Sequence, residues 1–525
     1  MLTFSPRWVS LLFAAAILLS IVLALALRVP GLERRPMHND EAVQAAKSGA
    51  LFESHGYVYD PNEFHGPTLY YFTLPSLWLS AVKSYADSTE FNYRIVPVCF
   101  GAAAILLLLL VADGMGRVAV VCSALLTAVS PALVFYSRDY IQETPLVFFT
   151  FAAIACGWRY TQSRAGPWAL LTGAAIGFMH ATKETSVIAL FSRGVALVGT
   201  RVLGRNEGAT RGNMKRNVLH AAFAILAAVG VSILFYSSFF THARGPLDSI
   251  LTFVRYFTRS NAANVHDKPW HFYIRLLTWN HEPGAPIWTE VFITVLALIG
   301  GVQAFRRNVA SEDQARRRTF ARFIAIYTAV MILAYSLIAY KTPWCALSFL
   351  HGLILLAGVG AASLLKGVRY WGVLAILLLA GTAHLGWQAF LMNGKFMSDL
   401  RNPYAYALTS PDAVRLGKRV EDLAALHADG RGMRVTVMEA NADYWPLPWY
   451  LRKLERVGFW YAPPPELDAP VLIASGDFDN ELLLELPGTY QKNQYGLRPG
   501  KLLWLYIDSD LWKKYLAAQH PEHSK

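Results

Sequence analysis

Charged side chains are scarce in this chain. Only 16% of its 525 residues are Asp, Glu, Lys or Arg, whereas 54% are hydrophobic, and the mean hydropathy is +0.32. A soluble protein needs more charge on its surface. The composition therefore excludes an ordinary soluble enzyme and indicates an integral membrane protein.

Cysteine is also scarce, and the sequence has no fixed-period repeat. The four cysteines, Cys99, Cys122, Cys156 and Cys345, lie in or beside apolar segments without the spacing of a metal site. They are typical of small buried residues rather than of a disulfide framework. The net charge of +12 would suit nucleic acid, but no basic helix with interleaved aromatics is present. Lysine and arginine gather in particular loops, as they do beside a bilayer, so we exclude nucleic acid as a partner.

Eleven apolar segments are predicted to span the membrane. The first, Trp8–Leu27, follows Arg7 and is long for a signal peptide, so we expect an uncleaved anchor, with cleavage after Ala24-Leu25-Ala26 as the alternative. The others are Ile95–Ala112, Val118–Phe135, Thr144–Trp158, Trp168–Ala181, Ser186–Val202, Val218–Phe240, Ile287–Ala304, Phe323–Tyr340, Trp344–Leu365 and Trp371–Leu391. The shorter ones depend on flanking aromatics or on local thinning of the bilayer.

The basic residues between these segments predict the topology. A twelfth apolar stretch, Pro67–Val82, is short and is interrupted by Pro75. If it lies at the interface without crossing, every basic cluster between spans falls on one side, which is then the cytoplasm. These residues are Arg7, Arg117, Arg159, Arg164, Arg201, Arg205, Arg211, Lys215, Arg216, Arg306, Arg307, Arg316, Arg317, Arg318, Arg322, Lys366 and Arg369.

The same topology places residues 393–525 on the outer face, as a soluble domain after a transmembrane domain of residues 1–392. Asp412–Ala428 has helical periodicity, and Asp443–Leu454 is predicted to form a second helix. Short buried strands are predicted at Met433–Met438, Pro470–Ala474 and Leu502–Ile507. We therefore predict a polytopic α-helical membrane protein with a small α/β domain, which has no G-x-G-x-x-G or P-loop motif.

Ionisable residues gather in the predicted outer loops, above all in the first loop at residues 29–94. The acids are Asp40, Glu41, Asp139, Glu143, Glu184 and Glu282, and the bases are Arg94, Arg138, Lys183 and Lys341. Single pairs, such as Arg138 with Glu143, suit a purely structural role. The whole set predicts a carboxylate base beside a cationic anion pocket, which suits transfer from a phosphate-linked donor.

Within the first loop, Asp40 is the predicted base. It lies early in a predicted interfacial helix, Asp40–Leu51, in which successive residues point roughly 100° apart. We therefore expect Asp40 to face the cavity and Glu41 to orient the site or pair with a cation. His38, His65 and His281 could hold a divalent metal with Asp40 or Glu282, but they are scattered without HExxH spacing. The metal site is therefore kept only as an alternative, and no cofactor is required.

An ordered set of short motifs resembles the GT-C class of integral-membrane glycosyltransferases. The likeness is to the protein O-mannosyltransferases and the lipid A aminoarabinose transferase, and more closely to the prokaryotic flippase-activity-associated glycosyltransferases. It rests on His38-Asn39-Asp40-Glu41-Ala42, His65-Gly66-Pro67-Thr68-Leu69-Tyr70-Tyr71, Arg94 with Pro97, Ser130-Pro131, Tyr136-Ser137-Arg138, Lys183-Glu184, Lys341-Thr342-Pro343-Trp344 and Asn402-Pro403-Tyr404.

The resemblance implies an enzyme of the prokaryotic cytoplasmic membrane that uses a polyprenyl-phosphate sugar. Its reaction would invert the anomeric centre, with Asp40 as base and a lipid, glycan or protein as acceptor. Arg94, Arg138, Lys183 and Lys341 are expected at the donor phosphate. The expected pocket residues are His38, His65, Tyr70, Glu143, Glu184, Glu282 and Trp344. His65-Gly66-Pro67 replaces the His-Pro-Pro of the O-mannosyltransferases, which puts that contact in doubt.

Two other functions compete with this one. A transporter or flippase component for lipid-linked sugars should show repeated halves and broken helices with polar groups near mid-membrane, and the sequence shows neither. A non-catalytic scaffold of a glycan-assembly complex would not need the Asp40 and cation set. The sugar, the acceptor and the length of the donor lipid are not predicted.

Overall fold

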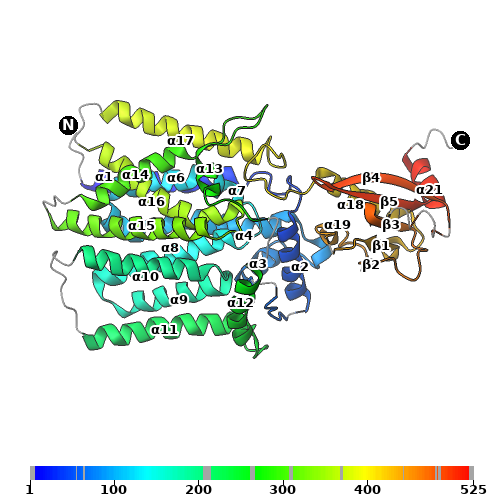
Figure 1. Cartoon of the computed structure of the whole chain (residues 1–525), viewed down its shortest axis with the longest axis horizontal. Helices are drawn as coiled ribbons and strands as arrows, with labels where there is room; N and C mark the ends of the chain where they lie inside the picture. Colours follow the sequence, from blue (N-terminus) through cyan, green and yellow to red (C-terminus); the bar gives the residue numbers. More distant parts are fainter. Residues whose placement is uncertain are drawn as a thin grey trace.

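A bundle of long helices lies beside a small sheet domain in the computed structural model (Figure 1). The structure describes residues 6–54, 56–62, 65–204, 214–260, 266–306, 311–366, 371–441, 443–478, 482, 486 and 488–519. Four of the basic loop residues, Arg205, Arg211, Arg307 and Arg369, lie outside these ranges.

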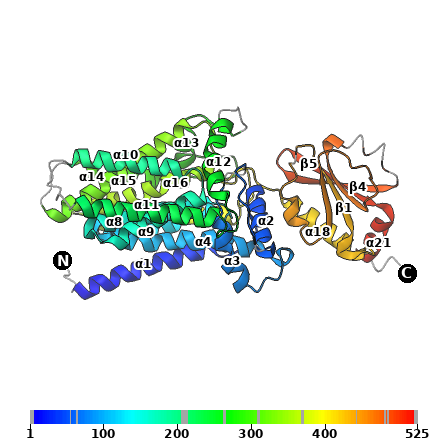
Figure 2. The ribbon, with the colours of Figure 1, turned by 90° about the horizontal axis from the view of Figure 1, so that it is seen from below.

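The long helices run side by side along the longest axis of the molecule (Figures 1 and 2). They are α1 (Pro6–Arg28), α4 (Glu90–Leu107), α6 (Arg117–Val129), α8 (Glu143–Ser163), α9 (Gly166–Thr182), α10 (Ser186–Leu203), α11 (Met214–Tyr236), α14 (Val291–Phe305), α15 (Glu312–Leu337), α16 (Leu347–Leu364) and α17 (Trp371–Asn393). Each of the eleven predicted spans coincides with one of them. Seven helices in the described part of the chain are long and apolar enough to cross a membrane, so the number eleven stays a prediction.

Small residues bring some of these helices close together. A Cβ atom on Gly300 of α14 would overlap the carbonyl oxygen of Leu356 in α16, and one on Gly360 would overlap the carbonyl oxygen of Leu296. Close backbone approach at small residues is a common way for helices to associate in a bilayer, where burial of apolar surface gives little driving force.

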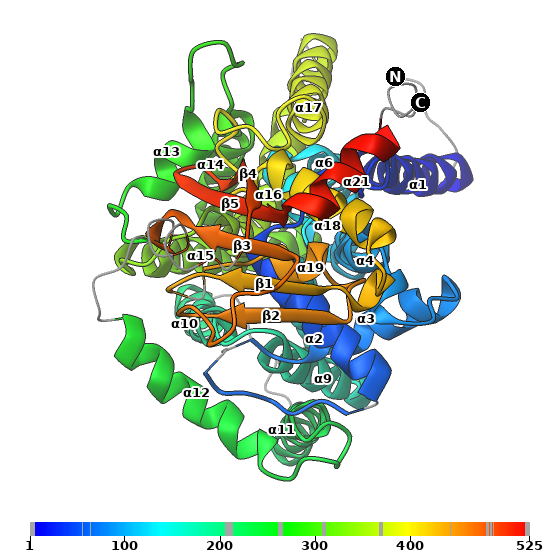
Figure 3. The same cartoon turned by 90° about the vertical axis from the view of Figure 1, so that its right-hand side faces the viewer.

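Shorter helices gather at one end of the bundle. They are α2 (Asn39–Ser54), α3 (Thr68–Leu79), α7 (Pro131–Tyr136), α12 (Gly245–Ser260) and α13 (Phe272–Thr278). Helix α3, which contains Pro75, has 12 residues and is about 18 Å long, too short to cross the hydrocarbon core. We call this end, next to the sheet domain, the motif end (Figures 1 and 3).

The C-terminal domain has a five-stranded mixed sheet in the order β2-β1-β3-β5-β4. Its strands are β1 (Arg434–Met438), β2 (Arg456–Trp460), β3 (Val471–Ser475), β4 (Tyr490–Arg498) and β5 (Lys501–Asp508), and its helices are α18 (Pro411–Leu426), α19 (Leu447–Tyr450) and α21 (Ser509–Gln519). Strand β1 pairs in parallel with β2 and β3, whereas β5 is antiparallel to β3 and β4.

The predicted elements of this domain were incomplete. The three apolar strands are present as β1, β3 and β5, but of the helix predicted at Asp443–Leu454 only Leu447–Tyr450 is helical. Strands β2 and β4 were not predicted because β2 is largely half-buried and β4 is polar, so neither forms an apolar run.

The sheet domain contacts the first loop of the membrane domain directly. The Met37 amide donates to the Tyr450 hydroxyl at 2.7 Å, and the Thr409 hydroxyl donates to the Met37 carbonyl, also at 2.7 Å. The Trp449 indole donates to Glu90 at the start of α4 at 3.0 Å. The sheet domain therefore holds Met37, three residues before Asp40, through both its backbone amide and its carbonyl group.

Candidate active site

The predicted site residues lie at the motif end, on elements far apart in the sequence. They come from the start of α2, the loop before α3, the turn between α7 and α8, the end of α9 and the loop between α15 and α16. The predicted basic loops that the structure describes lie at the opposite end of the bundle (Figure 1).

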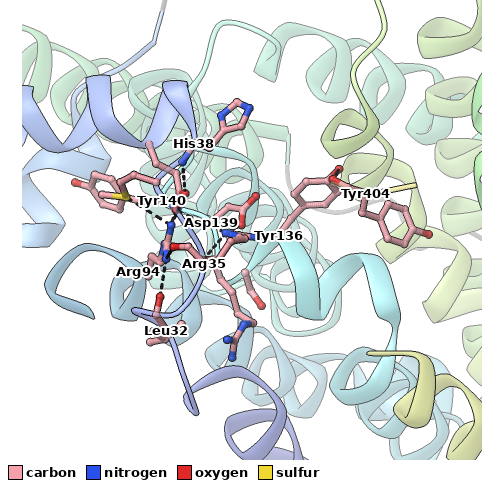
Figure 4. Close-up of polar contacts among 12 residues, drawn as sticks. Leu32, Arg35, His38, Arg94, Tyr136, Asp139, Tyr140 and Tyr404 are labelled. Atoms are coloured by element: carbon pink, nitrogen blue, oxygen red, sulfur yellow. Dashed lines mark hydrogen bonds and ion pairs between the residues drawn. The ribbon is translucent and has the colours of Figure 1, made fainter. Parts of the chain in front are cut away.

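Glu41 and Arg94 form a buried ion pair at the centre of this end (Figure 4). The Arg94 Nε and Nη2 atoms donate to the two Glu41 carboxylate oxygens, each at 2.7 Å, and the side chains are 1% and 0% exposed. Burial alone would raise the pKa of Glu41, but Arg94 and then Arg35 outweigh it and lower this pKa to about 2. Glu41 is therefore a permanent anion that pairs with a cation, one of its two expected roles.

The remaining N–H groups of Arg94 bind the backbone of the first loop. They donate to the carbonyl oxygens of Leu32, Arg35 and Pro36 at 2.6, 2.9 and 3.1 Å. Every N–H of the guanidinium thus has a protein acceptor, which differs from the expected contact with the donor phosphate. The geometry gives Arg94 a positioning role: it shapes the turn that leads to Asp40.

Asp40 has very different surroundings. It is half-buried, and its carboxylate makes no hydrogen bond or ion pair with the described residues, although its backbone amide donates to His38 Nδ1 at 3.1 Å. Burial, and next to it the Asp40 charge, raise the pKa of Tyr340 to about 12. Asp40 is thus an accessible, unpaired acceptor.

A hollow of about 340 Å³, partly open to solvent, is lined by His38, two residues before Asp40. Its lining includes Arg35, His38, Asp139, Tyr136, Trp344, Tyr404, Tyr406 and Thr409. The His38 and Trp344 rings meet edge to face at 5.8 Å, and Trp344 lies equally far from Tyr406. Of the predicted pocket residues, His38 and Trp344 line this hollow, whose aromatic wall suits an organic substrate.

A smaller hollow of about 190 Å³ is lined by three arginines, Arg35, Arg94 and Arg138, with Leu32, Asn393 and Met397. Arg35 forms an ion pair with Asp139, and Figure 4 shows these two side chains between Arg94 and Tyr136. Burial, with smaller effects of Arg94 and Arg138, lowers the pKa of Arg35 to about 9 although Glu41 raises it. Positive charge therefore exceeds negative charge around this hollow.

Arg138 contacts carbonyl groups instead of the Glu143 partner considered from sequence. Its Nη1 donates to the carbonyl oxygens of Arg28 and Pro30 at 2.6 and 2.8 Å, at the end of α1. Burial, followed by repulsion from Arg94 and Arg34, lowers the pKa of Arg138 to about 10. Its charge is stabilised by dipoles but is not neutralised by a carboxylate.

Lys183 differs from Arg138 in this respect. Its ammonium group forms an ion pair with Glu143, the first residue of α8, and both side chains are nearly buried. Burial alone would lower the pKa of Lys183, but Glu143 and Glu184 outweigh it and raise this pKa well above the usual value. Lys183 is thus neutralised internally, which differs from the expected phosphate contact.

The neighbouring Glu184 pairs with His65, whose Nδ1 lies 3.2 Å from its carboxylate. The His65 and Lys183 backbones form an isolated β-bridge, and the Gly66 amide donates to the Thr182 carbonyl at 3.1 Å. A Cβ on Gly66 would overlap the Ala181 carbonyl, so this position requires glycine. The turn at Gly66-Pro67 therefore docks the start of α3 onto the end of α9.

Lys341 is nearly buried and has carbonyl partners. Its Nζ donates to the Lys268 carbonyl at 3.0 Å and to that of Ile338, at the end of α15. Close by, the His266 ring contacts the Tyr406 hydroxyl at 2.6 Å and lies 4.9 Å from the Tyr340 ring. Like Arg138, Lys341 donates to carbonyl groups. Burial lowers the pKa of Lys341, and the charge of the exposed Asp267 raises it in part.

Three further predicted residues do not join these hollows. Tyr70 is buried between α2 and α3, where its hydroxyl donates to Gln44. His281 and Glu282 are exposed in the loop after α13. Among the described residues no group of three His, Cys, Asp or Glu side chains could hold a metal. His38, His65 and His281 each have separate surroundings, so their arrangement does not fit the metal site considered from sequence.

Sequence reasoning missed several buried polar residues of this end. Glu290, at the start of α14, accepts hydrogen bonds from Ser130, the Ala132 amide and the Tyr404 hydroxyl at 2.7, 2.9 and 3.0 Å. Arg28 donates to the carbonyls of Thr127 and Ala128 at the end of α6. Both are ionisable residues at the edge of an apolar segment, and that position could have identified them from the sequence.

Comparisons with known proteins agree with this architecture. Residues 65–245 match the model of the Dolichyl-phosphate-mannose-protein mannosyltransferase family. No curated protein matches the sequence. ArnT from Cupriavidus metallidurans bound to undecaprenyl phosphate is similar in structure, with a TM-score of 0.61 at 15% identity over 97% of this chain and 99% of that one.

A second similar structure is the archaeal oligosaccharyltransferase AglB from Archaeoglobus fulgidus, in complex with an inhibitory peptide and a dolichol-phosphate. Its TM-score is 0.55 at 12% identity, over 97% of this chain and 77% of that one. At such identities the likeness concerns the fold. The family match, which covers residues 65–245 of the membrane domain, fits the GT-C class of integral-membrane glycosyltransferases.

Proposed function

We propose that the protein transfers a sugar from a polyprenyl-phosphate carrier to an acceptor hydroxyl or amine on the outer face of the membrane. The observation that carries this proposal is the isolation of the Asp40 carboxylate. Glu41, Asp139, Glu143 and Glu184 are each paired with a cationic or histidine partner. Among the described residues Asp40 and Glu282 have no such partner. Glu282 is exposed, whereas Asp40 is half-buried and lies two residues after His38, which lines the aromatic hollow.

An unpaired, half-buried carboxylate suits a general base. In the proposed reaction Asp40 takes the proton from the acceptor while the acceptor attacks the anomeric carbon from the face opposite the phosphate. The bond from that carbon to the phosphate oxygen breaks, and the lipid phosphate leaves in a single displacement that inverts the anomeric centre. Proton transfer of this kind typically contributes about 10²–10⁴-fold to a rate.

The leaving phosphate needs positive charge that is not already neutralised. Arg94 and Lys183 are matched by Glu41 and Glu143, whereas the partners of Arg138 and Lys341 are backbone carbonyls. We therefore assign the leaving phosphate to Arg138 and Lys341 in preference to Arg94 and Lys183. Undecaprenyl phosphate and dolichol-phosphate bound to the two similar structures support a polyprenyl phosphate as donor carrier.

The test is a transfer assay with the full-length protein in nanodiscs. Undecaprenyl-phosphate hexoses and pentoses serve as donors and a membrane extract of the host as acceptor source. Wild-type protein should release undecaprenyl phosphate and label an acceptor, and Asp40→Asn should slow both while still binding undecaprenyl phosphate. Equal transfer by the two proteins would refute the assignment of the base.

The outer location is tested separately. An alkaline phosphatase reporter fused after residue 393 should be active only if the C-terminal domain lies outside the cytoplasm. Activity of a cytoplasm-dependent reporter at the same position would place the motif end, and with it the reaction, on the inner face.

A further inference from the structure

The C-terminal domain carries a mixed aromatic and charged surface that the proposed reaction does not use. We call it the β1–β2 surface, and define it by Glu439, Asp443, Tyr444, Phe459, Tyr461 and Lys501. These residues lie at or just after the ends of the parallel strands β1 and β2 and at the start of β5. Ligands of α/β sheets commonly bind beyond the carboxyl ends of parallel strands.

Strand geometry puts the aromatic residues and Glu439 on the same side of the sheet. Val437 and Phe459 are register partners on the face that packs against α18 and α19. Because side chains alternate along a strand, Glu439 and Tyr461 continue that face. Trp460, the partner of Met438, belongs to the opposite face, where Met438 lies in a separate core.

The aromatic part of the surface is preformed and accessible. The Tyr444 and Phe459 rings are 4.7 Å apart at an interplanar angle of 34°. Tyr461, two positions after Phe459 on the same side of the sheet, is 61% exposed. An exposed tyrosine beside two further aromatic residues offers a ring face to a ligand.

The charged part offers acceptors and donors next to these rings. Lys501 Nζ lies 2.7 Å from Glu439 Oε1 and 3.8 Å from Asp443 Oδ2, and Asp443 also pairs with Arg498. Glu439 is 0% exposed, and its Oε2 atom has no hydrogen-bond partner among the described residues. A buried carboxylate oxygen without a partner is costly, and a ligand hydroxyl would satisfy it.

The β1–β2 surface adjoins the candidate base through Asn39. With the Asn39 amide turned to the orientation that satisfies both its ends, its NH₂ group donates to the Trp445 carbonyl at 2.8 Å and its oxygen accepts from Arg498 at 2.5 Å. Arg498 is the partner of Asp443. Asn39 is the residue before Asp40 and the first residue of α2. The surface is thus connected through Arg498 to the residue that precedes the candidate base.

We propose that the β1–β2 surface binds a sugar ring of the acceptor, so that the acceptor is a glycan. A pyranose has an apolar face of C–H groups, which packs on an aromatic ring, and an edge of hydroxyl groups, which are donors and acceptors at once. Tyr461 with Tyr444 matches the face. Asp443, Glu439 and Lys501 match the hydroxyl edge, since carboxylates accept and ammonium groups donate. This inference rests on the proposed function and names its acceptor class.

A peptide is a poorer match to the same residues. An extended peptide needs a free row of backbone donors and acceptors or deep side-chain pockets. The β1–β2 surface instead presents carboxylates and an ammonium group together with an exposed aromatic ring. The carboxylates and cations also neutralise one another, which favours a neutral, hydroxyl-rich ligand over a charged one.

The experiment is glycan binding by the full-length protein in nanodiscs of phosphatidylethanolamine and phosphatidylglycerol. A printed array of bacterial and archaeal oligosaccharides identifies a bound glycan, and thermophoresis then gives its Kd for each variant. Tyr461→Ala and Asp443→Asn should each raise the Kd by about tenfold, the loss of one stacking or charge-assisted contact. Trp460→Ala, an exposed aromatic on the other face of the same strand, is the matched control and should change the Kd less than twofold.

The outcomes separate this inference from the proposed function. Absence of glycan binding by the wild type, an unchanged Kd in both surface variants, or an equal loss in Trp460→Ala would overturn the glycan site. Binding of a printed peptide array in place of the oligosaccharides would overturn it as well. Asp40→Asn should bind the glycan as well as wild type does. If wild-type protein binds glycan but transfers no sugar from any donor, the proposed function fails and the glycan site stands.

Discussion

Asp40 and Glu41 are adjacent residues of one helix, yet their carboxylates lie in opposite surroundings. Glu41 is fully buried and accepts hydrogen bonds from Arg94, the His38 amide and the Tyr140 amide. Asp40 is half-buried and has no side-chain partner among the described residues. Because consecutive helical residues diverge by roughly 100°, one acid can lie in the interior while the other stays accessible.

The cations of the motif end divide in the same way. Arg94 and Lys183 each face a carboxylate, so these two regions are neutral and fix the loops. Arg138 and Lys341 face carbonyl groups, so their charge remains available to an anion. From this comparison we infer that the ion-paired residues hold the loops in place and that the unpaired charged residues take part in the reaction. Substitutions in the two groups can test this inference.

The largest expected effect belongs to the isolated acid. Asp40→Asn keeps the shape of the side chain and removes the proton acceptor, so transfer should fall by about 10²–10⁴-fold. Because Asp40 has no ion-pair partner, the apparent Tm in detergent should stay within a few degrees of wild type. The measurement is single-turnover release of undecaprenyl phosphate, paired with thermal unfolding of the same preparation. A large drop in Tm would place Asp40 with the structural group instead.

The next largest effect is expected in the buried pair. Arg94→Met removes both hydrogen bonds from the guanidinium to the buried Glu41 carboxylate and leaves only Arg35, at 3.8 Å, as a cationic neighbour. Breaking such a pair typically costs about 3–5 kcal/mol. The variant should therefore unfold at clearly lower temperature and yield less folded protein, even before any assay of transfer.

Its control is the double variant Arg94→Met with Glu41→Gln, which removes the uncompensated charge. We expect the double variant to be more stable than Arg94→Met alone. Wild-type stability of the single variant would show that Arg94 does not support the loop and would reopen its assignment to the donor phosphate.

A third prediction concerns pH. The pKa of Glu41 falls from an ordinary value of 4.5 to about 2 in the folded protein. A lowered carboxyl pKa stabilises the fold above the unfolded value, and this stabilisation is lost as the pH falls from about 4.5 towards 2. The difference amounts to roughly 3 kcal/mol.

Between pH 6 and pH 3 the apparent Tm should therefore fall more steeply for wild type than for Glu41→Gln, whose side chain does not titrate in this range. Parallel pH profiles for the two proteins would contradict the lowered pKa and the tight ion pair behind it.

The sequence was sufficient for the features that depend on local pattern. Long apolar runs predicted the helices of the bundle, and the 3.6-residue period predicted that Asp40 and Glu41 would diverge. The one-sided distribution of arginine and lysine predicted that the motif loops would meet at one end. Each of these inferences needs only neighbouring residues or a count of loops.

Partners distant in the sequence could not be predicted in this way. Glu41 and Arg94 are separated by 53 positions, and nothing local distinguishes Arg94 from Arg138 as the partner of that carboxylate. Arg35, which pairs with Asp139, was not singled out because it follows another arginine in a polar loop. Strand β4 was not predicted, because this edge strand is polar and has no apolar run (Tyr490–Arg498).

The smallest expected effect compares two lysines of the motif end. Lys341→Met removes an ammonium group whose acceptors are the carbonyls of Lys268 and Ile338, so no buried carboxylate is left unpaired. The protein should remain folded, and its Kd for undecaprenyl phosphate should rise by about tenfold, the worth of one charge-assisted contact. Lys341→Arg, which keeps the charge, should restore most of that affinity.

Lys183→Met should show the reverse pattern, because it leaves the Glu143 carboxylate nearly buried and without its cation. Its apparent Tm should fall clearly, whereas the molecules that stay folded should bind undecaprenyl phosphate almost as wild type does. Measuring Kd and Tm for both variants therefore tests the division of charges directly. If Lys183→Met loses affinity without losing stability while Lys341→Met does the opposite, the two lysines have exchanged roles, and the donor phosphate lies beside α9 instead of beside the loop that follows α15.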